Sequence, residues 1–503
     1  MHRKTVNVFK SGSLAMSEVF NKAIIAIFIL CSILITAYVL FLPPRPGVAD
    51  QGDFQRVMDV TGLIEKGPPE EETESLFFKY VKSEYIMAPV SLIRLLGIIP
   101  TTSMIYPITV AKTLCRIGGS GIFNTEVLAF VYSVMYITAL TLCIKWGGTD
   151  AKIRSFIAAI LSLLILMDGN YLVWFNSLYG EPMMIIGLVL FSASILNVSN
   201  KIDCLTSKDL LFVFISSILF LGSKAQCISA LPLVVLMILR VYWLKDKARK
   251  AALMKKALIP VILIVFYTLG FYLQINATCG VDTKYNSVFY GILKDSENPE
   301  RDLQILGLSP DMAAEAGKHA YLPETEYEKY APWSEITLKE FNGKISYFKI
   351  IKFYLLNPGR LIQGMEYTAS QSFKTSSFLG KYKKTDIQQY TYQFGRFTFW
   401  SDIREKFLPN KLAFIVFFYV ITLTATVINY PKAQKKDKVR IELVWFIAAV
   451  GIFQFPMPYL GNGRADTAKQ LFLFNYTFDI LIIILAICIF QFLVNLAKHR
   501  KFP

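Results

Sequence analysis

The stretch from Ala23 to Leu42, AIIAIFILCSILITAYVLFL, contains no charged side chain. A helix of about 20 apolar residues is long enough to cross the hydrocarbon core of a membrane. The rest of the 503-residue chain has the same character, because 54% of its residues are hydrophobic and only 18% are charged, whereas about 25% of the residues in soluble domains are charged. The sequence therefore predicts an all-α integral membrane protein.

A cleaved signal peptide is the alternative interpretation of this first stretch. However, residues 23–42 exceed the apolar core of a signal peptide, which has about 7–15 residues. The stretch is followed by Pro43-Pro44-Arg45-Pro46, which lacks the small residues of a cleavage site. We therefore expect residues 23–42 to remain as the first membrane helix.

Nine further apolar blocks follow, and together the blocks predict about ten transmembrane helices. The spans are 23–42, 122–144, 154–168, 182–198, 209–222, 226–243, 258–276, 411–430, 441–460 and 475–496. Basic residues gather in alternate connections, with seven between 240 and 256 and five between 432 and 440. Because cations near span ends resist transfer across the membrane, these connections and both termini, 1–22 and 497–503, are expected on the cytosolic side. The net charge of +16 is then an orientation signal, and no nucleic-acid partner is expected.

This orientation leaves two long connections on the outward side, 43–121 and 277–410. Within the first, the amphipathic stretch from Tyr85 to Leu96 is expected along the membrane interface, because Arg94 would be costly in a span. The second contains a helix-period run near 345–356 that is bounded by turn signals. Both connections are predicted to be mainly helical, and the weak period-two alternation argues against a β-sandwich. The predicted division is a membrane domain over 23–276, an outer helical loop over 277–410 and C-terminal transmembrane helices over 411–496.

Three clusters of polar residues lie at the outer ends of the spans. They are Asp50, Asp53 and Arg56 in DQGDFQRVMD (50–59), Asn176, Tyr179 and Glu181 in NSLYGE (176–181), and Arg464, Asp466 and Lys469 in GNGRADTAKQ (461–470). The centres of the spans carry almost no ionisable residue, whereas a transporter usually needs such groups near the midplane. The clusters therefore indicate a cleft at the outer surface for a polar substrate whose other part lies in lipid. A sugar carried on a lipid phosphate fits this description.

Each cluster also has a purely structural interpretation. Asp50 or Asp53 could cap a helix that begins near Phe54. The aromatic residues around Tyr179 could belong to an interfacial belt, and the cations of the last cluster could contact lipid headgroups. The sequence leaves these alternatives open.

Sugar transfer from a polyprenyl phosphate to a hydroxyl group requires few catalytic groups. The leaving group is a stable phosphate anion, so it has little need of the general acid of a glycosidase. One carboxylate can deprotonate the acceptor hydroxyl as a base, and cations can hold the growing charge on the phosphate. Attack from the face opposite the phosphate inverts the anomeric configuration.

The segments DQGDFQRVMD (50–59), FNSLYGEP (175–182), KYNSVFYGILKDSENPERDLQILGL (284–308) and GRADTAKQLFLFN (463–475) resemble the GT-C type of polytopic membrane glycosyltransferase. More narrowly, they resemble the WsfD-like hexosyltransferases of bacterial cell-surface glycan assembly. The resemblance implies an inverting hexosyltransferase with Asp53 as the preferred base and Asp50 as the second candidate. The donor phosphate would be bound by Arg464, Lys469 and Arg56, and the sugar or acceptor by Tyr179, Glu181, Asn176, Asp466 and His319. Gln470 departs from the family pattern, which has a histidine at that place.

The implied partners are a polyprenyl-phosphate-linked sugar donor, a surface glycan, lipid or protein acceptor, and membrane lipids. A divalent metal held by Asp50, Asp53 and Glu181 is a weaker alternative, because the sequence lacks a dense carboxylate cluster. The alternative functions are a flippase or exporter of lipid-linked glycans, a glycan polymerase or ligase, and a structural scaffold. The composition suits a bacterial plasma membrane, with the site facing outward.

Overall fold

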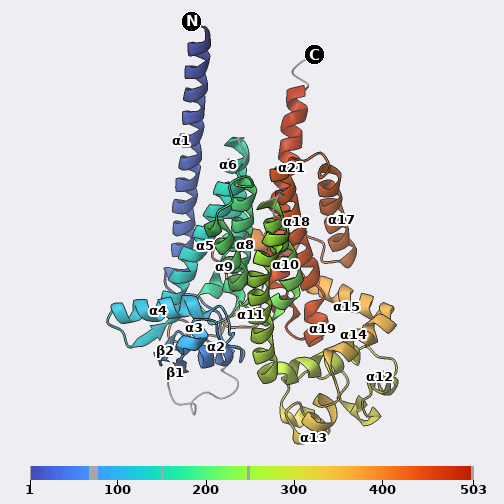
Figure 1. Ribbon diagram of the computed structural model, residues 1–503. Coiled ribbons are helices and arrows are strands. Elements are labelled where there is room, and N and C mark those ends of the chain that lie inside the picture. The colour runs from blue at the N-terminus through green and yellow to red at the C-terminus, as the bar shows by residue number, and fades with distance from the viewer. Residues whose placement is uncertain (1, 67–77, 149–151, 246–249, 376, 500–503) are drawn as a thin grey trace.

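The computed structural model describes residues 2–66, 78–148, 152–245, 250–375 and 377–499. Long helices form a bundle, and the N- and C-termini lie at the same end of it (Figure 1). The connection after the first helix and the long connection between α11 and α17 lie at the opposite end. We call this opposite end of the bundle the loop end.

In the described part of the chain, eight helices are long and apolar enough to cross a membrane. They lie within α1 (His2–Thr36) with its continuation η1 (Ala37–Phe41), α5 (Thr125–Gly147), α8 (Glu181–Asn200), η6 (Ala225–Ala230) with α10 (Leu231–Lys245), α11 (Lys250–Tyr285), α17 (Leu412–Asn429), α18 (Lys435–Gln454) with α19 (Met457–Asn462), and α21 (Phe472–His499). A ninth is added if the bent pair Ile153–Leu166 and Gly169–Phe175, which turns by 60°, forms one span. This pair contains α6 (Lys152–Leu161), η4 (Ser162–Leu166), α7 (Gly169–Leu172) and η5 (Val173–Phe175). The predicted all-α, multi-pass membrane architecture is confirmed.

The predicted span 209–222 differs from the others in length. It corresponds to α9 (Ser207–Leu221), which has 15 residues. At about 1.5 Å per residue, α9 measures roughly 22 Å, which is less than the ~30 Å of the hydrocarbon core. It packs against α8 and α11. Among the described residues, the number of full-length spans is therefore slightly lower than the pattern of apolar blocks predicted.

Helix α8 lies at the centre of the bundle. Of its most apolar stretch, 89% is buried inside the protein, and it packs against α5, α9, α18 and α21. A helix that is apolar on all sides is typical of such a position. Gly187 allows the close approach to α9, because a Cβ there would lie 2.6 Å from the Cα of Phe220. Since α8 begins at Glu181, its packing places this carboxylate at the loop end.

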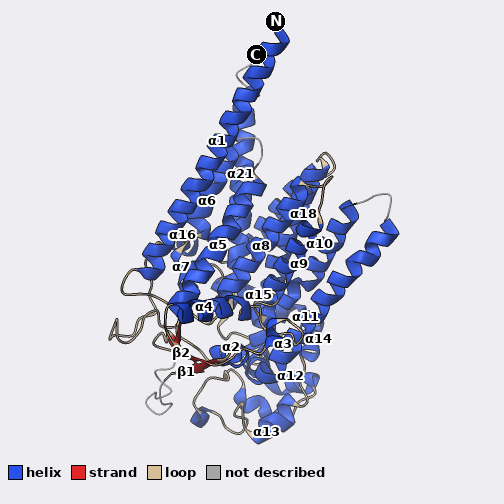
Figure 2. Cartoon of the chain, turned by 60° about the vertical axis from the view of Figure 1, so that its left-hand side comes forward, coloured by secondary structure: helices blue, strands red, loops and turns tan. Residues whose placement is uncertain are grey.

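The first connection carries a small antiparallel sheet in the order β1-β2-β3. The strands are Leu63–Glu65, Glu84–Met87 and Ile122–Asn124, and Figure 2 shows the strand colour only at the loop end. The amphipathic stretch from Tyr85 to Leu96 is therefore divided, because its first residues belong to β2 and only Leu92–Leu95 form a helix, α3. Strands of three or four residues are too short to show a period-two pattern. The other helices of this connection are α2 (Phe54–Thr61) and α4 (Ile105–Ile117), and its remaining described residues lie in loops and turns.

The second connection is helical, as predicted. Its elements are η7 (Asn286–Ile292), α12 (Pro299–Leu306), η8 (Pro310–Glu315), η9 (Glu324–Glu326), α13 (Glu335–Thr337), η10 (Leu338–Asn342), α14 (Tyr347–Leu356), α15 (Pro358–Gln371) and α16 (Phe399–Phe407). Helix α14 matches the run near 345–356. Phe289, Leu303, Phe341 and Phe353 belong to a separate small core of this connection.

The two connections are joined by main-chain hydrogen bonds. The amide of Gly47 donates to the carbonyl of Lys381 at 2.8 Å, and the amide of Ala49 donates to that of Gly380 at 2.9 Å. A Cβ on Gly380 would lie 1.8 Å from the carbonyl oxygen of Lys79, so only glycine allows this approach. The pairing places Lys381 beside the chain that leads into the 50–59 motif.

Candidate active site

Asp50 holds the turn that starts helix α2. One of its carboxylate oxygens, Oδ1, accepts hydrogen bonds from the amides of Gly52 (2.9 Å), Asp53 (2.9 Å) and Phe54 (3.1 Å). Burial raises the pKa of Asp50 to about 6, although the hydrogen bonds from the backbone lower it. Asp53, by contrast, makes no capping hydrogen bond with its side chain. The structure thus gives the capping role to Asp50 and leaves the carboxylate of Asp53 for other contacts.

The carboxylate of Asp53 lies between two cations. Its Oδ1 pairs with Arg56, one turn further along α2, and its Oδ2 accepts from Nζ of Lys469 at 2.7 Å. Gln51 links the same segments, because its Nε2 donates to Asp466 at 2.7 Å and its Oε1 accepts from Lys469 at 3.2 Å. Lys469 and Asp466 belong to the segment around α20 (Thr467–Gln470). Two motifs more than 400 residues apart therefore meet at the loop end.

Tyr179 forms one wall beside Lys469. The Nζ of Lys469 lies 4.3 Å from the centroid of the Tyr179 ring, a cation–π distance. The ring packs edge-on against Phe54 and Trp174, with centroid distances of 4.8 and 5.1 Å. The Tyr179 hydroxyl donates to the carbonyl of Ala49 at 3.1 Å. Tyr179 is thereby locked in place as part of the site wall.

Glu181 forms a second carboxylate–cation pair near the first. It is fully buried, and its Oε1 accepts from Nζ of Lys224 at 2.5 Å. Its Oε2 has no hydrogen-bond partner within the described ranges. Burial lowers the pKa of Lys469, and the charges of Glu181 and Asp466 oppose this shift. The two pairs are thus close enough to interact electrostatically.

Asn176 has a structural role in this geometry. Its Nδ2 donates to the carbonyl of Pro46 at 2.7 Å, and its Oδ1 accepts from Thr125 at 2.6 Å. These two bonds tie the bend after α7 to the chain that precedes Asp50. Both polar atoms of the Asn176 amide are therefore used in positioning the 50–59 motif.

Arg464 and His319 lie toward the second connection. Arg464 pairs with Asp295, and its guanidinium lies 4.6 Å from the ring centroid of Tyr367. Burial lowers the pKa of His319, and the charge of Asp466 opposes this shift. Asp466 therefore has two neighbours in the site: it accepts a hydrogen bond from Gln51 and interacts electrostatically with His319.

Lys381, from the second connection, is a further cation of the site. Only 2% of its surface is exposed, its Nζ donates to Oγ of Ser377 at 3.3 Å, and its Nζ lies 5.6 Å from the ring centroid of Trp174. Burial, together with the charge of Lys469, lowers the pKa of Lys381 to about 7. A buried lysine near Lys469 is thus held in an environment that disfavours its charge.

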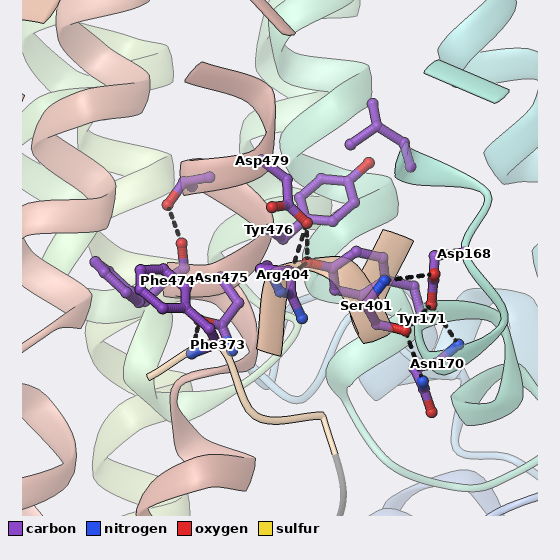
Figure 3. A network of polar contacts seen from close by, with 12 residues as sticks. Asp168, Asn170, Tyr171, Phe373, Ser401, Arg404, Phe474, Asn475, Tyr476 and Asp479 are labelled. Atoms are coloured by element: carbon purple, nitrogen blue, oxygen red, sulfur yellow. Dashed lines mark hydrogen bonds and ion pairs between the residues drawn. The ribbon is translucent and has the colours of Figure 1, made fainter. Parts of the chain in front are cut away.

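Arg404 of α16 forms a buried polar network behind the site (Figure 3). Its Nη1 donates to Asp479 of α21 at 2.6 Å and also contacts the hydroxyl of Tyr171, which itself donates to Asp479 at 2.7 Å. Arg404 is fully buried. Nearby, Asp168 accepts from the amide and hydroxyl of Ser401 at 2.9 and 2.8 Å. These bonds anchor α16 against the bend between α6 and α7.

The comparisons with known proteins place the chain in a family. The family model described as the YfdI N-terminal transmembrane domain matches residues 8–502. The chain belongs to this family. The comparison with curated proteins finds no match. The WsfD-like assignment is not among these findings and stays a prediction.

Among solved structures, the YfdI-family chain is similar to an archaeal oligosaccharyltransferase, AglB from Archaeoglobus fulgidus, in complex with an inhibitory peptide and a dolichol-phosphate. The sequence identity is 14% and the TM-score is 0.40. The alignment covers 96% of this chain and 52% of AglB. The chain thus spans about half the length of that protein.

Sequence reasoning missed three cations of the YfdI-family site. Lys224 lies in the three-residue connection 223–225, which the sequence predicts on the outward side. The distribution of basic residues gives no reason for a lysine there, so this exception was an available signal. Lys381 and Arg404 lie in a long polar connection with many basic residues. Their burial depends on contacts with distant segments, so no local pattern marks them.

The carboxylates of the YfdI-family site do not converge on one point. Asp50 caps α2, Asp53 pairs with Arg56 and Lys469, and Glu181 pairs with Lys224. Across the described ranges, no group of three or more His, Cys, Asp or Glu side chains could hold a metal ion. The arrangement instead joins one carboxylate to two cations beside an aromatic wall, which suits proton transfer next to an anionic group.

Proposed function

We propose that this chain is an inverting glycosyltransferase that moves a hexose from a polyprenyl-phosphate donor to an outward-facing glycan, lipid or protein acceptor. Membership of a transmembrane family supports a reaction at a membrane surface, and so do the eight or nine apolar helices found in the described part of the chain. In this proposal the loop end faces outward and both termini face the cytosol. Asp53 is the base, and Lys469 and Arg56 bind the phosphate of the donor.

The observation that carries this proposal is the position of Asp53 between Lys469 and Arg56 at the loop end. Transfer to a hydroxyl needs a base and a phosphate-binding cation within reach of the same anomeric carbon. The contacts of Asp53 with both cations support these roles, and one oxygen of Asp50, the other candidate base, is already engaged by three amides. Asp53 is also 25% exposed at its side chain, so an acceptor can approach it.

The proposed reaction is a single displacement. The acceptor oxygen attacks the anomeric carbon while Asp53 takes the hydroxyl proton. The bond between the anomeric carbon and the phosphate oxygen breaks, and its electron pair stays on the phosphate. As the charge on the phosphate grows, Lys469 and Arg56 shift their contacts from Asp53 to the phosphate. Nearby cations stabilise a carboxylate in its charged form and so weaken it as a base. The shift therefore makes Asp53 a better base.

Pairs of variants on helix α2 test this role of Asp53. Cells that carry the wild-type chain, Asp53→Asn or Asp59→Asn would be compared with cells that lack it, by mass spectrometry of the surface glycans. Asp59 is the matched control, because it is an exposed aspartate in α2 whose carboxylate accepts a hydrogen bond from Gln55. We expect a gain of one hexose unit with the wild type and with Asp59→Asn, and its loss with Asp53→Asn.

A normal hexose content with Asp53→Asn, at equal protein abundance, would remove Asp53 as the base. The same experiment separates the other functions considered. A flippase would leave the composition of each glycan unit unchanged, and a polymerase or ligase would change the mass by a whole oligosaccharide. A scaffold would show no dependence on either carboxylate.

A further inference from the structure

Four cations gather around Trp174 and Tyr171. A narrow cavity is lined by side chains that include Asn170, Trp174, Lys374, Arg404, Lys469 and Asn475, and Lys381 lies against Trp174 from the second connection. We call Lys374, Lys381, Arg404 and Lys469 the cation cluster. Lys374 and Lys381 lie in one segment, whereas Arg404 and Lys469 come from two others, so the fold brings the charges together.

The cation cluster has fewer carboxylates than cations. Lys469 pairs with Asp53, and Arg404 pairs with Asp479. Lys374 donates to the amide oxygen of Gln371 at 3.0 Å, and Lys381 donates to a serine hydroxyl. Neither of these two lysines forms an ion pair within the residues that the structure covers. Among the described residues, Lys374 and Lys381 therefore lack a carboxylate partner, and an anion beside Lys381 would favour the charged form that burial disfavours.

The buried end of the cluster also has hydrogen-bond donors to spare. Nε and Nη2 of Arg404 are buried and have no partner among the described residues. Figure 3 shows the guanidinium next to Tyr171 and Asp479, with Asn170 and Asn475 on either side. The cavity that Arg404 lines measures about 10 Å³, which is the space of one water-sized atom. Free donors around such a space suit a single oxygen atom of an anion.

We propose that the cation cluster binds the phosphate of the carrier lipid as the sugar leaves it. This inference rests on the proposed function. The donor is a phosphodiester with one negative charge, whereas the released phosphate monoester carries about −1.5 to −2 charges at neutral pH. The two lysines without a carboxylate partner in the described part of the chain therefore favour the more highly charged product over the donor, and their attraction for the phosphate grows along the reaction. A site of this kind stabilises the leaving group rather than the ground state.

A binding experiment with the full-length protein in detergent tests the proposal. Isothermal titration would compare farnesyl phosphate, which is a monoester, with its methyl diester and with neutral farnesol. We expect the monoester to bind at least about tenfold more tightly than the diester, which corresponds to ~1.4 kcal/mol. Phosphatidylglycerol, a diester of the membrane, should not displace the monoester, and inorganic phosphate should compete only weakly because it lacks the chain.

Variants of the two unpaired lysines connect this preference to the cluster. Lys381→Met and Lys374→Gln should each weaken binding of the monoester about tenfold and reduce its preference over the diester. Lys383→Gln is the control, because Lys383 lies two residues from Lys381 and pairs with Glu126 at 2.8 Å. Equal binding of monoester and diester by the wild type would overturn the proposal, and so would unchanged monoester binding by both Lys381→Met and Lys374→Gln.

The pH dependence gives a second measurement that a structural role would not affect. Burial and the charge of Lys469 lower the pKa of Lys381 to about 7, so binding above pH 7 requires proton uptake. The affinity of the wild type for the monoester should fall up to about tenfold per pH unit above 7, whereas Lys381→Met should show a smaller slope.

Asp53→Asn should bind the monoester and fail in transfer. Monoester binding by a wild type without transferase activity would disprove the proposed function and leave the phosphate site in place.

Discussion

Replacement of Lys381 by methionine is expected to stabilise the protein. The pKa of Lys381 lies near 7 in the fold, because of burial and the charge of Lys469, against an ordinary value of 10.5. Between pH 7 and 10.5 the unfolded chain therefore binds the proton and the folded chain largely does not. The free energy of unfolding of the wild type consequently rises with pH across this window, and the penalty is greatest below pH 7.

The size of this effect follows from the same shift. Each pKa unit corresponds to about 1.36 kcal/mol, so Lys381 lowers the stability of the fold by about 4 kcal/mol at pH 7 and by about 2 kcal/mol at pH 9. Methionine has the same unbranched shape without the charge, and it removes this penalty. Against this gain, the variant loses one hydrogen bond to Ser377 at 3.3 Å and the contact of the ammonium with the ring of Trp174.

Thermal unfolding followed by tryptophan fluorescence, in one detergent at pH 6.5 and at pH 9, measures the difference. Lys381→Met should melt several degrees above the wild type at pH 6.5, and the gap should narrow at pH 9. Lys383→Met should not gain stability, because it breaks an ion pair with Glu126. A melting temperature of Lys381→Met at or below that of the wild type at pH 6.5, or a gap that does not change with pH, would refute the reasoning.

Three further predictions concern the other charged residues of the site. Glu181→Gln leaves Lys224 without its partner in a largely buried place, so it should lower the free energy of unfolding by about 3–5 kcal/mol. The melting temperature should fall, and the double variant Glu181→Gln with Lys224→Met should partly restore it. Asp50→Ala removes the acceptor for three amides and should lower the free energy of unfolding by about 1–2 kcal/mol. Asp50→Asn keeps an acceptor oxygen and should retain most of the stability. Lys469→Gln should slow hexose transfer about 10²- to 10³-fold, but Arg464→Gln, which loses a pair with Asp295, should slow it less than tenfold.

The membrane architecture could be predicted because its signals are local. Apolar blocks give the spans directly, and the loop end of the bundle collects the two connections that the basic residues marked as a common side. The run near 345–356 became α14 because its apolar period is complete within ten residues. The short strand at Tyr85 was not predicted, since its stability comes from pairing with β1 and β3 rather than from its own pattern.

The candidate site could be predicted only in part, because its geometry depends on contacts between distant segments. Asp53 and Lys469 were both in the predicted set, and they meet directly. Arg464 had the same sequence signal as Lys469, but the fold turns it toward Asp295. Lys381 became a site residue through the pairing of its segment with Gly47, and no property of its own neighbourhood in the sequence reveals that.

The most direct test of the central claim is the movement of a labelled hexose. Purified protein in nanodiscs would be mixed with a radiolabelled hexosyl polyprenyl phosphate and with membranes from cells that lack the chain, which supply the acceptor. The wild type and Asp59→Asn should move the label from the extractable lipid into the glycan fraction, and Asp53→Asn should do so at least about 10²-fold more slowly. Transfer by Asp53→Asn at a rate near that of the wild type, or a wild type that leaves the label on its lipid, would contradict the account.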